Sequence, residues 1–249
     1  MAERIERHEI TLTSLEPFRI GAPQDVMEGV DNPIATIGGR AAVLGPTLKG
    51  ALRANIEKHL IEQYPNDEDM KPCIPSSEST LSDEERKLIS TRIFRAGGSC
   101  LFSRRNKSSS ICPACYLLGA QGLVGFVRVP FLMTDVTPEE LYSVRIDRAA
   151  GVVSERTNRE YQILPQGTQF IGVLEILMQD FKGWEMGKHR QTIEGGTCQG
   201  DKWLKGKGWS ADKIKTEFIL DRLTSITLLG GFKSKGCGKV SIQIRAVAN

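Results

Sequence analysis

Apolar and polar residues alternate along several short segments of the chain, and in two longer segments the apolar residues recur every three or four positions. Alternation is typical of half-buried strands, and the longer recurrence is typical of amphipathic helices. One helix is expected to begin near Pro46 or Thr47, and a second to cover residues 214–229, where two glycines close it. Strands are expected at residues 8–13, 122–136, 144–148, 161–164, 168–178 and 240–244. These patterns predict an α+β fold with one helical layer on one antiparallel sheet.

Three stretches lack a regular pattern. Residues 17–44 indicate a long loop, rich in glycine and proline, that carries Asp25 and Asp31. Residues 63–116 are mostly polar and are expected to form an insertion, and residues 183–207 form a second irregular stretch. We expect a single domain over residues 1–249 that contains these stretches. Loops this long inside a compact domain are more often functional than inert, so the first loop is a candidate site.

Composition limits the class of protein. The chain has 249 residues, of which 40% are hydrophobic, and 33 basic against 30 acidic side chains give a formal net charge of +3. This balance excludes a mainly disordered chain. The longest apolar stretch is interrupted by Arg128 and Pro130, and the first residues lack the apolar core of a secretory signal, so we expect a cytoplasmic protein without a membrane span. Basic runs at residues 92–107 and 233–245 are either solvated faces or contacts for an anionic partner.

The cysteines are grouped in a way that suggests a metal site. Cysteines of a cytoplasmic protein stay reduced, which favours metal ligation or simple burial over disulfides. Cys112 and Cys115 are two residues apart, a spacing typical of half a tetrahedral zinc site, and Cys100 and Cys73 lie upstream in the same polar insertion. Because no apolar core is evident there, a metal would stabilise the insertion, and we expect one structural zinc on these four thiolates. A redox pair or buried thiols are the alternatives.

Two further positions suit a polyanion. The first helix opens with Lys49 and Arg53 one turn apart, where free backbone N–H groups and the helix dipole also favour an anion. The alternative is a capped helix with two surface cations. Residues 230–239 combine four glycines with three lysines, so the backbone can approach a ligand closely while the lysines supply charge for phosphates. This loop does not match the Walker pattern, and ATP binding is not expected.

Several features follow one another along the chain in a characteristic order. They are the early strand, Asp31-Asn32-Pro33, the turn and helix of residues 45–53, Cys115-Tyr116-Leu117-Leu118-Gly119, Arg145-Ile146-Asp147-Arg148 and the C-terminal glycine-rich loop. This order resembles the RAMP superfamily of CRISPR-associated proteins, and most closely the repeated backbone subunit of type III effector complexes. The resemblance covers about residues 8–244. No single motif is unique, and their order makes the resemblance specific.

The resemblance implies a ferredoxin-like, RNA-recognition-type palm, a thumb hairpin at residues 148–164, and stacking of copies along a CRISPR guide RNA. In that family an aspartate on the loop after the first strand is needed for metal-dependent cutting of target RNA, and Asp31 occupies the matching place. One aspartate is sufficient in principle, because Mg²⁺ binds one or two carboxylates together with substrate phosphates. The implied RNA-binding residues of the helix, thumb and loop are Thr47, Lys49, Gly50, Arg53, Arg148, Arg156, Thr157, Asn158, Lys233, Ser234, Lys235 and Gly236.

The chain also departs from the family pattern. The family more often has Gly-Ser-Ser before the helix lysine, and it favours an arginine and an aromatic residue in the last loop, where this chain has Lys235 and Cys237. A lysine lacks the bidentate phosphate contact of an arginine. We expect a metal-dependent endoribonuclease subunit whose partners are guide RNA, target RNA, other copies of itself and other CRISPR effector subunits. The alternatives are a non-catalytic structural subunit and a stand-alone RNA-binding or RNA-processing protein.

Overall fold

The structure is a computed structural model that describes residues 3–22, 32–102, 111–144, 148–149, 151–152, 159–190 and 199–247. Its strands are β1 (Arg4–Ser14), β2 (Thr36–Ile37), β3 (Arg40–Val43), β4 (Val127–Arg128), β5 (Leu132–Thr134), β6 (Glu139–Ser143), β7 (Arg159–Ile163), β8 (Gln169–Gln179) and β9 (Val240–Ala246). Its α-helices are α1 (Gly45–Gln63), α2 (Asp83–Ser90), α3 (Pro113–Leu118), α4 (Ala211–Ile214) and α5 (Asp221–Thr224). Short turns of other helix types are η1 (Glu78–Thr80), η2 (Gln199–Leu204), the π-helical η3 (Lys215–Leu220) and η4 (Lys233–Lys235). None of the helices in these ranges has the length and apolar character needed to cross a bilayer.

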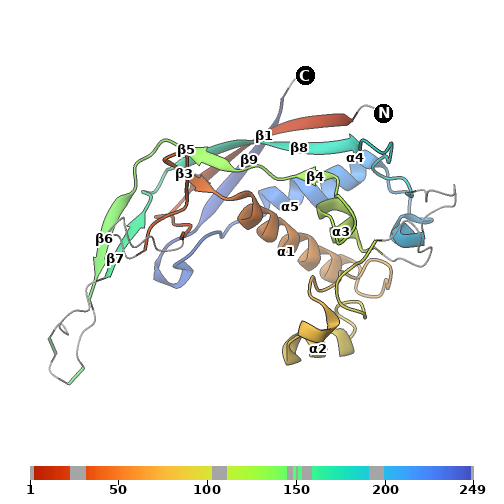
Figure 1. Ribbon diagram of the computed structural model, residues 1–249, viewed down its shortest axis with the longest axis horizontal. Helices are drawn as coiled ribbons and strands as arrows, with labels where there is room; N and C mark the ends of the chain where they lie inside the picture. The colour runs from red at the N-terminus through yellow and green to blue at the C-terminus, as the bar shows by residue number, and fades with distance from the viewer. Residues whose placement is uncertain are drawn as a thin grey trace.

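Seven strands form one antiparallel sheet in the order β2-β3-β5-β8-β1-β9, with β4 also paired to β8. Side chains alternate across a strand, so His8, Ile10 and Leu12 of β1 are buried while the residues between them lie on the opposite face. Figure 1 shows the sheet along the top of the molecule, with α1, α3, α4 and α5 beneath it. The prediction of helices layered on an antiparallel sheet is therefore confirmed at this level.

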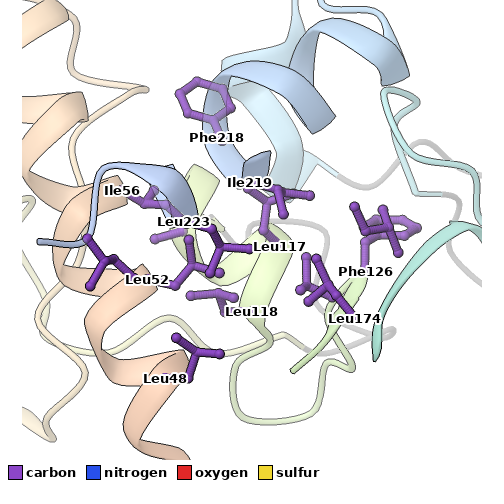
Figure 2. Close-up of a cluster of buried hydrophobic side chains, with 14 of the residues drawn as sticks. Leu48, Leu52, Ile56, Leu117, Leu118, Phe126, Leu174, Phe218, Ile219 and Leu223 are labelled. Atoms are coloured by element: carbon purple, nitrogen blue, oxygen red, sulfur yellow. The ribbon is translucent and has the colours of Figure 1, made fainter. Parts of the chain in front are cut away.

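The helical layer is held by a continuous apolar core. Leu48, Leu52 and Ile56 recur every four residues on α1 and are fully buried. Figure 2 shows these side chains facing leucines of α3 and α5. Helix α1 begins directly against the chain that leads into β5, because Gly45 has no side chain: a Cβ there would lie 3.0 Å from the carbonyl oxygen of Val129. The first turn of α1 is thus fixed close to the sheet.

Strands β6 and β7 form a separate two-stranded hairpin that projects from one end of the sheet (Figure 1). At its base, Asn32 forms a bridge with Tyr161 and Phe18 forms one with Leu164. The range 148–164, expected as a thumb, includes β7, whereas β6 lies earlier in the chain. The strand expected at residues 144–148 is not formed at either end, since β6 stops at Ser143 and Arg148 lies in a turn; residues 145–147 lie outside the described part.

The polar insertion has more order than the sequence suggests. Helix α2 begins with a capping box, in which the Ser82 hydroxyl accepts from the Glu85 N–H and the Glu85 carboxylate accepts from the Ser82 N–H. Met70, Phe102 and Ile111 are buried and belong to the main core. The expectation that the insertion lacks an apolar core was therefore wrong, because a few well-spaced apolar residues anchor it to the helical layer.

Three other expectations need correction. The long loop of residues 17–44 contains the β2–β3 hairpin, whose turn is made by Gly38 and Gly39, both with positive φ. The single strand expected at residues 122–136 is split into β4 and β5 by a segment that contains Pro130. The last helix ends at Thr224 rather than at residue 229, because residues 227–229 are extended and pair with the chain that leads into β9, where Leu228 forms a bridge with Lys239.

Candidate metal centre and nucleic-acid interface

Four buried cysteines converge where the insertion meets α3. Cys112 is the residue before α3 and Cys115 lies in its first turn, while Cys73 and Cys100 come from irregular segments of the insertion. Their sulfur atoms all lie within 4.8 Å of one another, and those of Cys73 and Cys115 are 3.4 Å apart. The prediction that these four residues come together is confirmed.

The donor set fits a closed tetrahedral metal site. Four sulfurs around one zinc, at Zn–S distances of about 2.3 Å, lie about 3.8 Å from one another, which is close to the spacing found here. Hydrogen bonds from the Cys100 and Cys112 thiols lower the pKa of Cys73, and they lower the pKa of Cys115 to about 7. Both shifts favour the thiolate form, which is the form that binds a metal. The four cysteines can hold a metal ion such as zinc, with no open position for a substrate.

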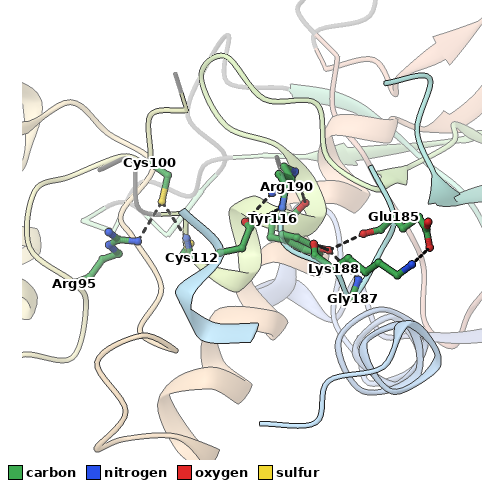
Figure 3. A network of polar contacts seen from close by, with 9 residues as sticks. Arg95, Cys100, Cys112, Tyr116, Glu185, Gly187, Lys188 and Arg190 are labelled. Atoms are coloured by element: carbon green, nitrogen blue, oxygen red, sulfur yellow. Dashed lines mark hydrogen bonds and ion pairs between the residues drawn. The ribbon is translucent and has the colours of Figure 1, made fainter. Parts of the chain in front are cut away.

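Two arginines surround the sulfurs. The guanidinium of Arg53 donates to the sulfurs of Cys73 and Cys115, each at 3.5 Å, and to the carbonyl oxygen of Cys73 at 3.2 Å. Its Nε lies 2.6 Å from Glu57. Burial works to lower the pKa of Arg53, but Cys115 and Glu57 raise it more, so the guanidinium is firmly charged. Arg95 donates to the Cys100 sulfur at 3.7 Å (Figure 3). The head group of Arg53 therefore faces the cysteines.

Helix α3 connects the cysteine cluster to a buried ion pair. Arg190 and Asp201, both side chains 0% exposed, are 2.8 Å apart. Arg190 also donates to the carbonyl oxygen of Tyr116 and lies over the Tyr116 ring, 4.3 Å from its centroid. Figure 3 shows Arg190 beside Tyr116, and Tyr116 follows Cys115 directly in α3. Removing either charge would leave the other buried without its partner, which is strongly destabilising.

A cleft of ≈ 560 Å³ lies between α1 and the glycine-rich loop. Thr47 and Lys58 line it from α1, and Gly230, Gly231 and Lys233 line it from the loop. Small residues of α1 at helical spacing keep its wall flat, and they include Ala51 and Ala54. The cleft combines a cation on each wall with backbone that is open to close approach, which suits a sugar-phosphate chain.

Lys49 lies outside this cleft. It lines a second hollow of ≈ 400 Å³ together with Arg128, Gly119 and Gly125, on the side of α1 that faces α3. Gly50 is exposed, with open space where a Cβ would be. Within two turns, α1 thus directs Thr47 to the cleft, Lys49 to the hollow and Arg53 to the cysteines. The predicted RNA-binding residues of α1 face three different surroundings.

The glycine-rich loop is a compact turn. Phe232 before η4 and Gly236 after it are both in the left-handed conformation. Lys233, Ser234 and Lys235 of η4 are exposed, and the Lys235 ammonium lies 4.6 Å from the centroid of the Phe232 ring. A left-handed conformation costs a phenylalanine free energy of about 1–3 kcal/mol, so the surrounding contacts must hold it. The backbone of the loop is therefore held in one conformation, from which Lys233 and Lys235 extend to the surface.

Several predicted site residues cannot be placed. Asp31, Arg156, Thr157 and Asn158 lie outside the described residues. Arg148 lies in an exposed turn. The neighbour of Asp31 can be described: the Asn32 N–H donates to the carbonyl oxygen of Glu160, and the Asn32 oxygen accepts from the Gln162 N–H.

Several residues of these sites were missed from the sequence, and Lys58, Arg95 and Phe232 are examples. Lys58 follows Thr47 by eleven residues, three turns of a helix, so the polar face of α1 could have indicated it. Arg95 belongs to the basic run but had no identifiable partner. Phe232 gave no signal, because its ring contacts Arg19 and Tyr161, which are far from it in the sequence.

Comparison with known families identifies a match that covers most of the chain. A family model described as the RAMP superfamily matches residues 11–241, which span β1 to β9 and include the cysteine cluster, the cleft and the hairpin. No curated protein matches the chain significantly.

Proposed function

The chain belongs to the RAMP superfamily, which indicates a CRISPR-associated subunit that binds RNA, and from this premise we propose that it is a guide-RNA-binding backbone subunit of a type III effector complex. In this proposal several copies stack along one guide RNA together with other effector subunits. The guide is held through its sugar-phosphate chain, so its sequence matters little.

The observation that carries the proposal is the cleft between α1 and the glycine-rich loop. Lys58 and Lys233 give it a cation on each wall, and Gly230 and Gly231 offer backbone without side chains. No carboxylate is among its lining residues in the described part of the chain. Phosphates of a single strand fit such a surface because each contact with a cation releases condensed counterions.

Binding of a fluorescent polyuridine RNA, measured over a range of salt concentrations, tests this proposal. Each phosphate contact contributes a slope of about −0.7 to the log–log plot of affinity against salt. Lys233→Gln and Lys58→Gln should each weaken binding and reduce the slope by about 0.7. Lys87→Gln, on the exposed face of α2, is the matched control and should change neither quantity. A flat salt response of the unmodified protein would contradict the proposal.

We also propose that the subunit cuts target RNA through Asp31. Asn32, the residue after Asp31 in the sequence, is hydrogen-bonded to β7 at the base of the hairpin. A Mg²⁺ ion would neutralise charge that develops on the reacting phosphate. In a complex reconstituted with guide RNA and partner subunits, Asp31→Ala should abolish cutting of a matched RNA while guide binding is retained. Asp69→Ala, at an exposed position, is the control, and unchanged cutting by Asp31→Ala would leave only a structural role.

The β6–β7 hairpin is the proposed thumb, and zinc is the proposed ion of the cysteine cluster. The hairpin projects beyond the sheet (Figure 1). This suits an element that reaches the RNA bound by the next copy of the subunit. The zinc would be structural, since four thiolates fill a tetrahedral site. Metal analysis of the purified protein should find about one equivalent of zinc, and less than about half an equivalent would argue against the site.

A further inference from the structure

Arg19 joins three segments that are distant in the sequence. It is 5% exposed, and its guanidinium donates to the carbonyl oxygens of Asn32 at 2.7 Å, Pro33 at 3.2 Å and Gln162 at 3.1 Å. Two of these oxygens belong to the short segment before β2, and the third belongs to β7 of the hairpin. A buried charge requires such partners, and the planar fork of an arginine can reach several carbonyls at once.

The same residue also holds the start of the glycine-rich loop. The Gly231 N–H donates to the Arg19 carbonyl oxygen at 2.8 Å, and a Cβ on Gly230 would lie only 2.4 Å from that oxygen. The Arg19 guanidinium lies 4.9 Å from the centroid of the Phe232 ring, and the ring of Tyr161 from β7 meets Phe232 edge-on at 5.1 Å. The loop is thus fixed to Arg19 through both main chain and side chain.

The conformation of Phe232 shows that this contact is specific. Phe232 has φ 57 and ψ 29, a region that favours glycine, and it lies directly before the exposed turn of Lys233 to Lys235. A phenylalanine adopts this conformation only where its surroundings determine it. Here the ring is held by Arg19 and Tyr161, so the direction of the loop depends on the base of the hairpin.

We propose that Arg19 is a positioning residue that locks the glycine-rich loop to the base of the β6–β7 hairpin, so that the two elements present one continuous surface to RNA. The contact with RNA rests on the proposed function, whereas the lock itself does not. Arg19 is buried and acts through Phe232 and Gln162, not by touching phosphate. A lysine cannot replace it, because a single ammonium lacks the fork that reaches both Asn32 and Gln162.

Amide hydrogen exchange of the free protein tests the lock without RNA. Arg19→Met should accelerate exchange of the Gly231 and Gln162 amides about tenfold, while the β1 amides of the central sheet keep their rates. Arg40→Met is the matched control: it removes an exposed arginine paired with Asp135 and should leave both amides unchanged. Unchanged rates at both amides in Arg19→Met, or equal acceleration throughout β1, would overturn the lock.

Phe232→Leu covers the case in which Arg19→Met does not fold. This half-exposed side chain can be shortened while the guanidinium keeps its carbonyl partners. The Gly231 amide should then exchange about tenfold faster. Wild-type exchange at Gly231 in this variant would overturn the proposal.

Polyuridine binding separates the lock from the proposed function. Arg19→Met should weaken binding about tenfold with an unchanged salt slope, because a buried positioning residue contacts no phosphate. A slope reduced by about 0.7 would show that Arg19 contacts RNA directly and would overturn positioning. If the unmodified protein does not bind polyuridine, the proposed function fails, and the exchange data still decide whether the lock exists.

Discussion

Replacing Arg53 by methionine should weaken metal binding rather than contact with RNA. The resemblance to RAMP proteins implies a phosphate contact for Arg53, but its head group donates to the sulfurs of Cys73 and Cys115, and its side chain is only 16% exposed. Outer hydrogen bonds to metal ligands typically contribute 10–100-fold to affinity, which is about 1.4–2.7 kcal/mol. Four thiolates on one Zn²⁺ carry two excess negative charges, so the loss of this cation belongs in the upper part of that range.

The assay is competition for zinc between the folded protein and a metallochromic chelator. Arg53→Met should release zinc at a chelator concentration roughly 30–100-fold lower than the unmodified protein requires. Lys49→Met is the matched control, because it removes a cation one turn earlier on the same helix, where it lines the hollow beside Arg128 rather than the cysteines. Its zinc affinity should not change.

The salt dependence of polyuridine binding completes the test. If Arg53 is committed to the sulfurs, Arg53→Met leaves the slope unchanged, whereas the loss of one phosphate contact reduces it by about 0.7. Unchanged zinc affinity together with a reduced slope in Arg53→Met would refute the reasoning, since it would mean that the guanidinium leaves the cysteines and binds RNA.

Further predictions concern stability. Arg190→Met should lower the free energy of unfolding by about 3–5 kcal/mol in urea titration, because it leaves Asp201 buried and unpaired, whereas Arg40→Met should cost at most about 1 kcal/mol at its exposed pair. Gly236→Ala, with φ +77 and open space around a Cβ, should cost about 1–2 kcal/mol. Gly230→Ala should cost more, because its Cβ would also meet the Arg19 oxygen, and equal effects would argue against that contact. Removal of metal from a metal-loaded sample with a strong chelator should lower the melting temperature and make the insertion susceptible to proteolysis. A melting curve that the chelator leaves unchanged would contradict a structural role for the metal.

The parts of the fold that follow simple periodicity were predictable. Strand β1 alternates cleanly, and α1 repeats Leu48, Leu52 and Ile56 every four residues, so both follow from the sequence alone. The β2–β3 hairpin was missed although Gly38-Gly39 is a typical turn for it, because its strands are too short to show alternation. The end of the last helix was misplaced because Ile226 and Leu229 are buried at helix-like spacing although the chain there pairs with residues 238–240, and spacing alone does not reveal that pairing.

The candidate site also has a part that the sequence predicts and a part that it does not. The four cysteines were predictable because the two-residue spacing of Cys112 and Cys115 restricts the chemistry to few choices. The direction of Arg53 was not, since a residue on the polar face of a helix can meet solvent, RNA or another segment. The insertion brings the sulfurs of Cys73 and Cys115 to that face, and only tertiary structure determines this.

Adjacent faces of helix α1 border three different parts of the molecule, and this limits how the protein can be redesigned. Thr47 borders the cleft, Lys49 the neighbouring hollow and Arg53 the cysteines, all within seven residues. A library that randomised residues 47–53 to alter RNA binding would also contain many variants that no longer bind the metal or fold. Most losses of RNA binding in such a library would therefore reflect failure to fold. Engineering of RNA binding should begin in the glycine-rich loop, at Lys233 and Ser234. These side chains are exposed, and their substitution leaves the cysteine cluster unchanged.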